Sequence, residues 1–333
     1  MLNRTNAFLQ HWMPYLTPIS VVLGVTIFSS LSSISYVVKW VFAFISFASC
    51  IGLNVKELRT TLTKPLPVII GMLIIQGVLP FIAFVVGKAL FNDDPYIIIG
   101  FVLAFTIPTG VITLMWVSIY GGNRAVTLAI ILVNTLLSPI LVPFTLNILV
   151  GAQVEMDIAG LMIGLLIMVV IPSLLGLLAN QLLKNKHTSI LSSKLAPFSK
   201  MAIFLVILIN SAVVAPFFKQ MDGKTIILAI IVFLMACFAY VTGFVIAKLF
   251  KWDDSVAISL MYNSGMRNTG VGAALAVSYF PASVAFPTVT AVLFQQFLAS
   301  MAGKIISKYV EKKQKKIVLL QRNNIIMTKQ KTF

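Results

Sequence analysis

The residues best suited to chemistry lie in one short polar run inside a long apolar region. This run reads Asn263-Ser264-Gly265-Met266-Arg267-Asn268-Thr269-Gly270. Arg267 has no carboxylate at its own depth, because the Asp and Glu residues all fall at the edges of apolar runs. A charge in the middle of a membrane span costs at least about 3 kcal/mol. We therefore expect Arg267 to attract an anionic substrate, the alternative being a fixed structural cation held by carbonyls and amides.

A second interruption occurs earlier in the chain, at Pro108-Thr109-Gly110. Proline removes a backbone donor and glycine adds freedom, so the helix is expected to break there. Broken helices expose amides and carbonyls that survive in a bilayer only where they face protein or a watery cavity. Pro108 alone is typical of an ordinary kink, but two breaks at equivalent places favour a binding site.

The neighbouring amides Gln295 and Gln296 extend this set, because two adjacent amides in an apolar run need several partners. Other single polar residues are more often contacts between helices than ligands. The candidate binding residues from the sequence are Arg267, Asn268, Thr269, Gly270, Asn263, Ser264, Thr109, Gly110, Gln295 and Gln296, with Pro108 and Gly265 at the helix breaks.

Enzyme chemistry is poorly supported. The chain has no Gly-x-Ser-x-Gly and no His-Glu-x-x-His motif, and its two histidines, His11 and His187, lie in peripheral segments. Cys50 and Cys237 show no metal-site spacing. We expect no catalytic residue, no resident metal and no organic cofactor.

The elements that position these residues are predicted to be membrane helices. Of 333 residues 59% are hydrophobic and 10% are charged, whereas a soluble protein carries about a quarter charged residues. Apolar runs predict ten spans in an all-α integral membrane fold. They lie near Pro14–Ser32, Val37–Asn54, Leu66–Leu90, Tyr96–Tyr120, Arg124–Val150, Asp157–Leu183, Ser199–Phe218, Lys224–Phe250, Ser255–Tyr279 and Val284–Lys308.

The net charge of +16 predicts orientation rather than nucleic-acid binding. Many Lys and Arg residues lie in the final segment and the others sit singly between apolar runs, so no basic stripe exists. With ten spans, the side opposite the termini holds only four of the basic residues, Lys39, Lys88, Lys219 and Lys224. The positive-inside rule therefore places both termini in the cytoplasm, in the cell membrane. Residues 309–333 form a basic tail attracted to anionic head groups.

An internal repeat appears at an offset of 160 residues. Asp93-Asp94 matches Asp253-Asp254, and Thr109-Gly110-Val111 matches Thr269-Gly270-Val271. Five spans separate the copies, so the second half, about 157–308, is inverted relative to the first, about 14–150. Inverted repeats are typical of alternating-access secondary transporters, and the whole chain is expected to form one such domain.

These motifs resemble the bile acid:sodium symporter family, whose ninth helix commonly reads Glu-x-Gly-Met-(Gln/Arg)-Asn-(Ser/Thr)-Gly. Three further segments are similar to its second, fifth and sixth helices: Ile51–Asn54, Asn134–Pro139 and Ile171–Leu178. The resemblance implies ten helices in a panel and a core, with broken helices 4 and 9 crossing at a central site. It also implies transport of an organic anion, often with sodium as the coupling ion.

The resemblance further implies sodium ligands, with departures. Asn263 stands where the family has Glu, and Arg267 where bacterial relatives have Gln. The fourth- and fifth-helix ligands correspond to Thr113 and Thr127, and the third-helix Gln to Gln76. Leu114 and Ile131 replace two further polar positions, and Gln295-Gln296 replaces a His-Asn pair. A sodium ion is implied near Thr113, Thr127 and Asn263, while Arg267 takes the electrostatic role of another.

Other functions stay open at this point. Tyr120-Gly121-Gly122-Asn123 is similar to carriers of the auxin-efflux type, which implies sodium-independent or proton-linked transport of an organic anion. A channel would conduct single-channel currents, whereas a carrier would show saturable uptake.

Overall fold

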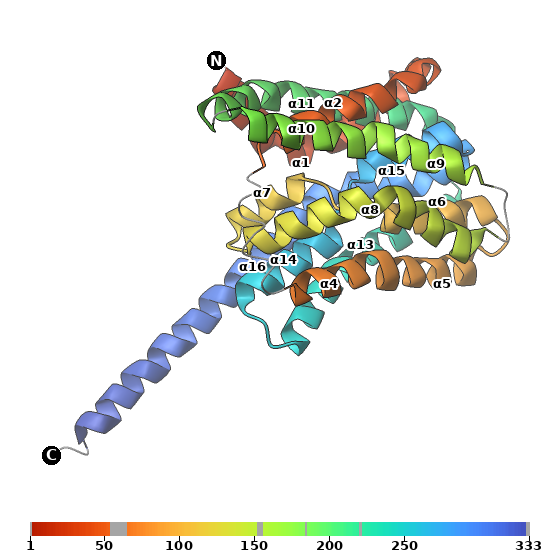
Figure 1. The fold of residues 1–333 in the computed structure, drawn as a ribbon. Coiled ribbons are helices and arrows are strands. Elements are labelled where there is room, and N and C mark those ends of the chain that lie inside the picture. Colours follow the sequence, from red (N-terminus) through yellow and green to blue (C-terminus); the bar gives the residue numbers. More distant parts are fainter. Residues whose placement is uncertain (1, 54–64, 152–155, 184, 220–221, 331–333) are drawn as a thin grey trace.

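The computed structural model describes residues 2–53, 65–151, 156–183, 185–219 and 222–330 (Figure 1). Every regular element in these ranges is a helix, as predicted. In chain order they are α1 (Leu2–Thr26), η1 (Ser29–Val37), α2 (Val38–Cys50), α4 (Leu66–Leu73), η3 (Ile74–Val78), α5 (Leu79–Phe91), α6 (Pro95–Thr106), α7 (Ile112–Ile119), α8 (Arg124–Val150), α9 (Ile158–Leu165), η4 (Leu166–Val170), α10 (Ile171–Leu182), α11 (Asn185–Val213), α12 (Ala215–Lys219), α13 (Gly223–Leu249), α14 (Asp254–Gly265), α15 (Thr269–Tyr279) and α16 (Ala282–Gln330).

Within the described ranges, seven helical stretches are long and apolar enough to cross a membrane. Three shorter apolar helices, Tyr15–Thr26, Pro95–Thr106 and Thr269–Tyr279, coincide with parts of predicted spans. The chain is therefore a multi-pass membrane protein. The fourth and ninth predicted spans are each divided into two helices, α6 with α7 and α14 with α15.

The helices form two layers, both seen in Figure 1. The panel layer consists of α1, α2, α9, α10 and α11, in which α11 packs on α1 and α2 while α10 packs on α2. The core layer consists of α4 to α8 and α13 to α16. Contacts of α15 and α16 with α11, and of α16 with α1, join the two layers.

Acidic and amide side chains begin several of these helices. Asp94, Asn123, Asp157, Asp222 and Asp253 each occupy an N-cap and accept a hydrogen bond from a backbone N–H three residues ahead, at 2.7–3.3 Å. Such caps satisfy donors that have no partner inside the helix. This explains why acidic residues stand at the edges of apolar runs.

Residues related by the sequence repeat have similar local surroundings. The Lys88 ammonium lies 5.8 Å from the ring centroid of Phe84, and the Lys248 ammonium lies 5.5 Å from that of Phe244. The two acidic pairs lie at the starts of equivalent helices. Asp94, the second acid of its pair, caps α6, whereas Asp253, the first acid of its pair, caps α14. Local contacts are therefore similar at these positions of the sequence repeat.

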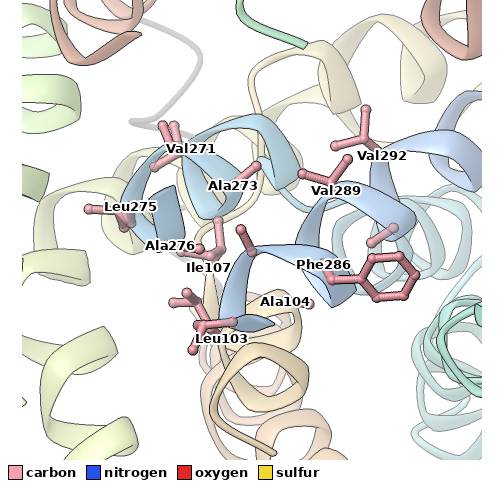
Figure 2. Close-up of a cluster of buried hydrophobic side chains, with 14 of the residues drawn as sticks. Leu103, Ala104, Ile107, Val271, Ala273, Leu275, Ala276, Phe286, Val289 and Val292 are labelled. Atoms are coloured by element: carbon pink, nitrogen blue, oxygen red, sulfur yellow. The ribbon is translucent and has the colours of Figure 1, made fainter. Parts of the chain in front are cut away.

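A buried hydrophobic cluster holds α6, α15 and α16 together (Figure 2). Its small residues allow close approach, since a Cβ on Gly100 of α6 would overlap the carbonyl of Val284 in α16. The side chains labelled in Figure 2 are Leu103, Ala104, Ile107, Val271, Ala273, Leu275, Ala276, Phe286, Val289 and Val292. This cluster fixes α6, which precedes the first break, and α15, which follows the second.

The basic segment after 308 continues α16 as one helix to Gln330, which projects from the bundle (Figure 1). The basic loop 54–64 and Glu155 lie outside the described residues, as do 331–333.

Candidate substrate and ion site

The helix breaks lie at the two polar runs expected from the sequence. α6 ends at Thr106, and Ile107 turns extended with ψ of 140°. This conformation follows from Pro108, because a proline disfavours helical geometry in the residue before it. α14 ends at Gly265, and Met266 is likewise extended, with ψ of 108°. The first helix therefore ends just before Pro108, and the second ends at Gly265.

The two breaks pair with each other. Thr109 and Arg267 form an isolated antiparallel bridge, and the Asn268 N–H donates to the Pro108 carbonyl at 2.8 Å. The Thr109 hydroxyl donates to the carbonyl of Asn263 at 3.1 Å. Irregular backbone buried in a membrane protein needs such partners, and here each break supplies them to the other.

Gln295 of α16 holds the second break in place. Its amide nitrogen donates to the Arg267 carbonyl at 2.6 Å, and its amide oxygen accepts from the hydroxyl of Thr269. The neighbouring Gln296 accepts from the Trp116 indole N–H at 3.2 Å. The two adjacent amides are thus bound to two different half-helices, α15 and α7.

The Arg267 guanidinium is buried in the core layer, with the residue only 3% exposed. One terminal nitrogen donates to the carbonyl of Ile75 at 3.3 Å, while Nε and the other terminal nitrogen have no hydrogen-bond partner. Among the described residues no carboxylate forms an ion pair with it. Its position just after α14 places the cation at a helix C-terminus, where carbonyl dipoles favour positive charge.

The Ile75 carbonyl is available because of a π-helical turn. In η3 the N–H of Leu79 donates to Ile74 instead of Ile75, and Pro80, the next residue, has no N–H to donate. A carbonyl left without a helical donor is a natural acceptor for a buried cation, and π-turns often occur at functional sites. Pro80 therefore creates the acceptor that Arg267 uses.

Several polar oxygens near the breaks are buried without a hydrogen-bond partner in the described structure. They include Oδ1 of Asn263, Oγ1 of Thr113 and Oγ of Ser264, each on a residue with no exposed surface, and Oε1 of Gln76. The Asn263 amide nitrogen donates to the Thr127 hydroxyl at 3.2 Å. Because α7, α8 and α14 pack against one another, these oxygens belong to one region of the core layer.

A cavity of about 120 Å³ lies between the breaks and the panel layer. Its core-layer wall is made by Thr109, Gly110, Arg267, Asn268, Thr269, Gly270, Gln295 and Gln296. The panel layer contributes hydroxyls, among them Thr17, Ser46, Ser49 and Ser173. The cavity is thus polar on both sides although most of its surroundings are apolar.

Helix ends give this cavity a positive potential. The N-termini of α7 and α15 begin at its wall, since Gly110 to Ile112 and Asn268 to Gly270 line it. Helix N-termini carry partial positive charge and attract anions. The same wall carries Arg267, so its field favours a negatively charged occupant.

The structure divides the predicted residues into two groups. Eight line the cavity, namely Thr109, Gly110, Arg267, Asn268, Thr269, Gly270, Gln295 and Gln296, and Pro108 accepts a hydrogen bond from one of them, Asn268. Gln76, Thr113, Thr127, Asn263 and Ser264 do not line it and lie deeper in the core layer, where Gln76 donates to Asn134 at 2.6 Å.

The panel hydroxyls were not predicted from the sequence. Ser46 and Ser49 stand three residues apart on α2 and therefore lie on the same helix face. This spacing is the sequence feature that could have indicated them as cavity-lining residues. Ser46 is bound to the Met168 carbonyl in η4 at 2.8 Å, which links α2 to α9 and α10.

A transporter of small molecules is the class of protein to which an all-helical membrane bundle belongs when two broken helices pair beside a cavity with polar groups on both walls. The chain belongs to the sodium bile acid symporter family, whose model matches residues 39–221. The family resemblance drawn from the polar run at 263–270 is confirmed.

Three relatives show the same relationship. The uncharacterized protein YbaS of Bacillus subtilis is 44% identical over 89% of this chain and 97% of its own length. The uncharacterized sodium-dependent transporter YocS of the same organism is 26% identical over 88% of this chain and 90% of its own length. The probable sodium/metabolite cotransporter BASS1 of Arabidopsis thaliana is 27% identical, over 68% of this chain and 56% of that protein. The family and its members are transporters, so the prediction that the chain is not an enzyme is confirmed.

Proposed function

We propose that the chain is a secondary active transporter that carries a small organic anion by alternating access, with sodium as the coupling ion. The observation that carries this proposal is the pairing of Thr109 with Arg267 beside the cavity. That pairing brings two helix N-termini to one wall of the cavity, which Arg267 also lines, and the buried Arg267 guanidinium extends to the carbonyl of Ile75. The panel layer and the core layer would move against each other and open the cavity to either side in turn.

The proposed topology has ten crossings in two inverted five-helix repeats, about 14–150 and about 157–308. Both termini and the segment 309–333 then lie in the cytoplasm. The similar local contacts at positions of the sequence repeat support this arrangement, as does the grouping of α1 and α2 with α9 to α11 in one layer.

Ion pairs at the helix ends support the assignment of residues to two opposite sides. Lys224 and Asp94, both assigned to the outer side, form an ion pair at 3.6 Å. Lys313 and Asp254, both assigned to the cytoplasmic side, form one at 2.6 Å. Among the ion pairs of the described residues, none joins two residues assigned to opposite sides.

One sodium ion would bind at the buried oxygens of Asn263, Thr113 and Thr127. Two of them, Asn263 Oδ1 and Thr113 Oγ1, lack a partner in the structure, and neutral oxygens suit a hard cation. Carbonyls of unwound helices commonly complete such sites. The residues therefore fit a sodium ion, although no carboxylate contributes to it.

Arg267 would take the place of a second cation. Its guanidinium already occupies the region between the break and η3, where Ile75 accepts from it and Gln76 Oε1 has no partner. A positive charge fixed there by its side chain attracts the transported anion, as a second sodium ion would otherwise do.

The test is uptake into proteoliposomes of a panel of radiolabelled carboxylates and sulfonates, with and without an inward sodium gradient. We expect saturable uptake of at least one anion that sodium accelerates. Thr113→Val is expected to raise the sodium concentration needed for half-maximal uptake. Thr290→Val is the matched control, because Thr290 is also a buried threonine with an unpartnered hydroxyl but lies in α16 and not in α7, α8 or α14.

Sodium-independent uptake would instead favour a carrier of the auxin-efflux type. The neutral amide of Asn263, in the place of the family's carboxylate, is the observation in favour of that alternative. Uptake of no anion under any gradient would contradict both.

A further inference from the structure

A second cavity, of about 260 Å³, lies between α13, α14 and α16. We call it the α13–α16 groove. It shares no residue with the cavity at the helix breaks. Its eleven lining residues are apolar or aromatic apart from one cysteine. The groove therefore cannot serve the polar cargo of the central cavity and needs another explanation.

The groove is open toward the surroundings of the bundle. Val241 is 57% exposed, Ile305 is 62% exposed and Tyr309 is 42% exposed, although all three lie on helices apolar enough to cross a membrane. In a bilayer Val241 and Ile305 contact hydrocarbon, and Tyr309 lies at the end of the groove that carries the lysines. A hollow with an apolar floor and an open lipid side matches an acyl chain.

Apolar shape alone does not select a lipid, because the tails of all lipids are equally apolar. Selection must come from the end of the groove near Tyr309. There the Lys248 ammonium lies 5.9 Å from the Tyr309 ring centroid, and Phe244 stacks edge-on against Tyr309 at 5.6 Å. Lys248 and Lys313 both bind the carboxylate of Asp254.

Positive charge exceeds negative charge at this end. Segments 248–254 and 308–313 together carry five lysines and three carboxylates. The proposed orientation places them at the cytoplasmic face, where anionic lipid head groups attract basic residues. The charge and the groove therefore favour a lipid with an anionic head group.

The inner wall of the groove contains an unused polar group. Tyr240 is 5% exposed, and its hydroxyl has no hydrogen-bond partner in the described structure. Its ring covers Gly265 at the end of α14, where a Cβ would overlap the ring. An occupant of the groove thus contacts the residue that packs on one of the two helix breaks.

We propose that the α13–α16 groove binds an anionic phospholipid, with one acyl chain between α13 and α16 and the phosphate beside Lys248 and Lys313. The bound chain packs against Tyr240 and stabilises the core layer around the break. This site is independent of the identity of the transported anion.

The test compares phosphatidylglycerol with phosphatidylcholine of identical acyl chains, added to the purified, delipidated full-length protein. Native mass spectrometry counts retained lipids, and the thermal unfolding midpoint reports stabilisation. We expect phosphatidylglycerol to be retained at least tenfold more strongly and to raise the midpoint more. Each of Lys248→Gln and Lys313→Gln is expected to weaken its retention about fivefold, without changing the retention of phosphatidylcholine.

Matched controls separate this site from general lipid contact. Lys88→Gln removes an ammonium that lies over Phe84 as Lys248 lies over Phe244, and should leave retention unchanged. Ala302→Trp fills the groove and should abolish the preference, whereas Ala89→Trp, on an exposed face of α5, should not. Equal or stronger retention of phosphatidylcholine, or an unchanged preference in Ala302→Trp, would overturn the proposal.

Discussion

Replacing Arg267 by glutamine tests the role of its buried charge. Arg267 is 3% exposed, and its guanidinium has no carboxylate partner within the described part of the chain. A lone charge in a membrane span costs at least about 3 kcal/mol, and we expect an anion bound beside it to recover about 1.4–2.8 kcal/mol of that cost. Since about 1.4 kcal/mol corresponds to a factor of ten, Arg267→Gln should weaken anion uptake at low sodium by about 10- to 100-fold.

Sodium should restore much of this loss. If the guanidinium stands in for a cation, its removal leaves room for an ion, and the dependence of uptake on sodium becomes steeper in Arg267→Gln. The assay is the initial uptake rate in proteoliposomes over a range of sodium and anion concentrations. Arg124→Gln, which removes an exposed Arg at the start of α8, is the control for general charge loss.

The fold should survive this change, because a polar residue without charge is less costly to bury than the cation. A thermal unfolding midpoint equal to or above that of the wild type would establish this. Unchanged uptake in Arg267→Gln at every sodium concentration would refute the assigned role. An equal loss at every sodium concentration would refute the idea that the guanidinium replaces an ion.

Two further predictions concern the frame around the site. Gly265→Ala should destabilise the protein by about 1–3 kcal/mol, because the added Cβ overlaps the ring of Tyr240. Gly110→Ala should be tolerated, because its Cβ would lie 3.6 Å or more from its neighbours. Thermal unfolding in detergent measures both effects, and equal destabilisation by the two substitutions would contradict this packing. Asp253→Ala should cost about 1 kcal/mol by removing the cap of α14, and Asp253→Asn should keep the cap. The Val256 N–H donates to Asp253 and lowers its pKa below the ordinary value, so this stabilisation is present above about pH 4 and is lost as the pH falls through the lowered pKa. Unfolding midpoints between pH 3 and 7 should therefore drop more for the wild type than for Asp253→Asn, and parallel curves would contradict the cap's contribution.

Local chemistry made the breaks predictable. Pro108 disfavours a helical conformation at Ile107, and the small and polar residues around Gly265 interrupt the second helix, so each position follows from neighbouring residues alone. The acidic caps follow in the same way from residue type and position. Apolar runs also located the helices, because a membrane span requires a minimum length.

The direction of the Arg267 side chain could not be predicted in this way. It depends on a carbonyl at Ile75, which lies 192 positions away in the sequence and is available only because Pro80 follows a π-turn. The hydroxyls of Ser46 and Ser49 were missed for a similar reason. Their importance depends on which face of α2 meets the breaks, and packing between layers decides this.

The most direct test of the central claim is whether the transported anion occupies the cavity between the panel layer and the helix breaks. Ser49→Cys places a thiol in the cavity wall, in a background in which Cys50 and Cys237 are replaced by serine. A negatively charged thiol reagent should label Ser49→Cys, and the transported anion with sodium should slow that labelling at least fivefold. Labelling of Ser33→Cys, at an exposed position on η1, should not change. Labelling of Ser49→Cys at the same rate with and without the anion, in protein that still transports it, would contradict the account.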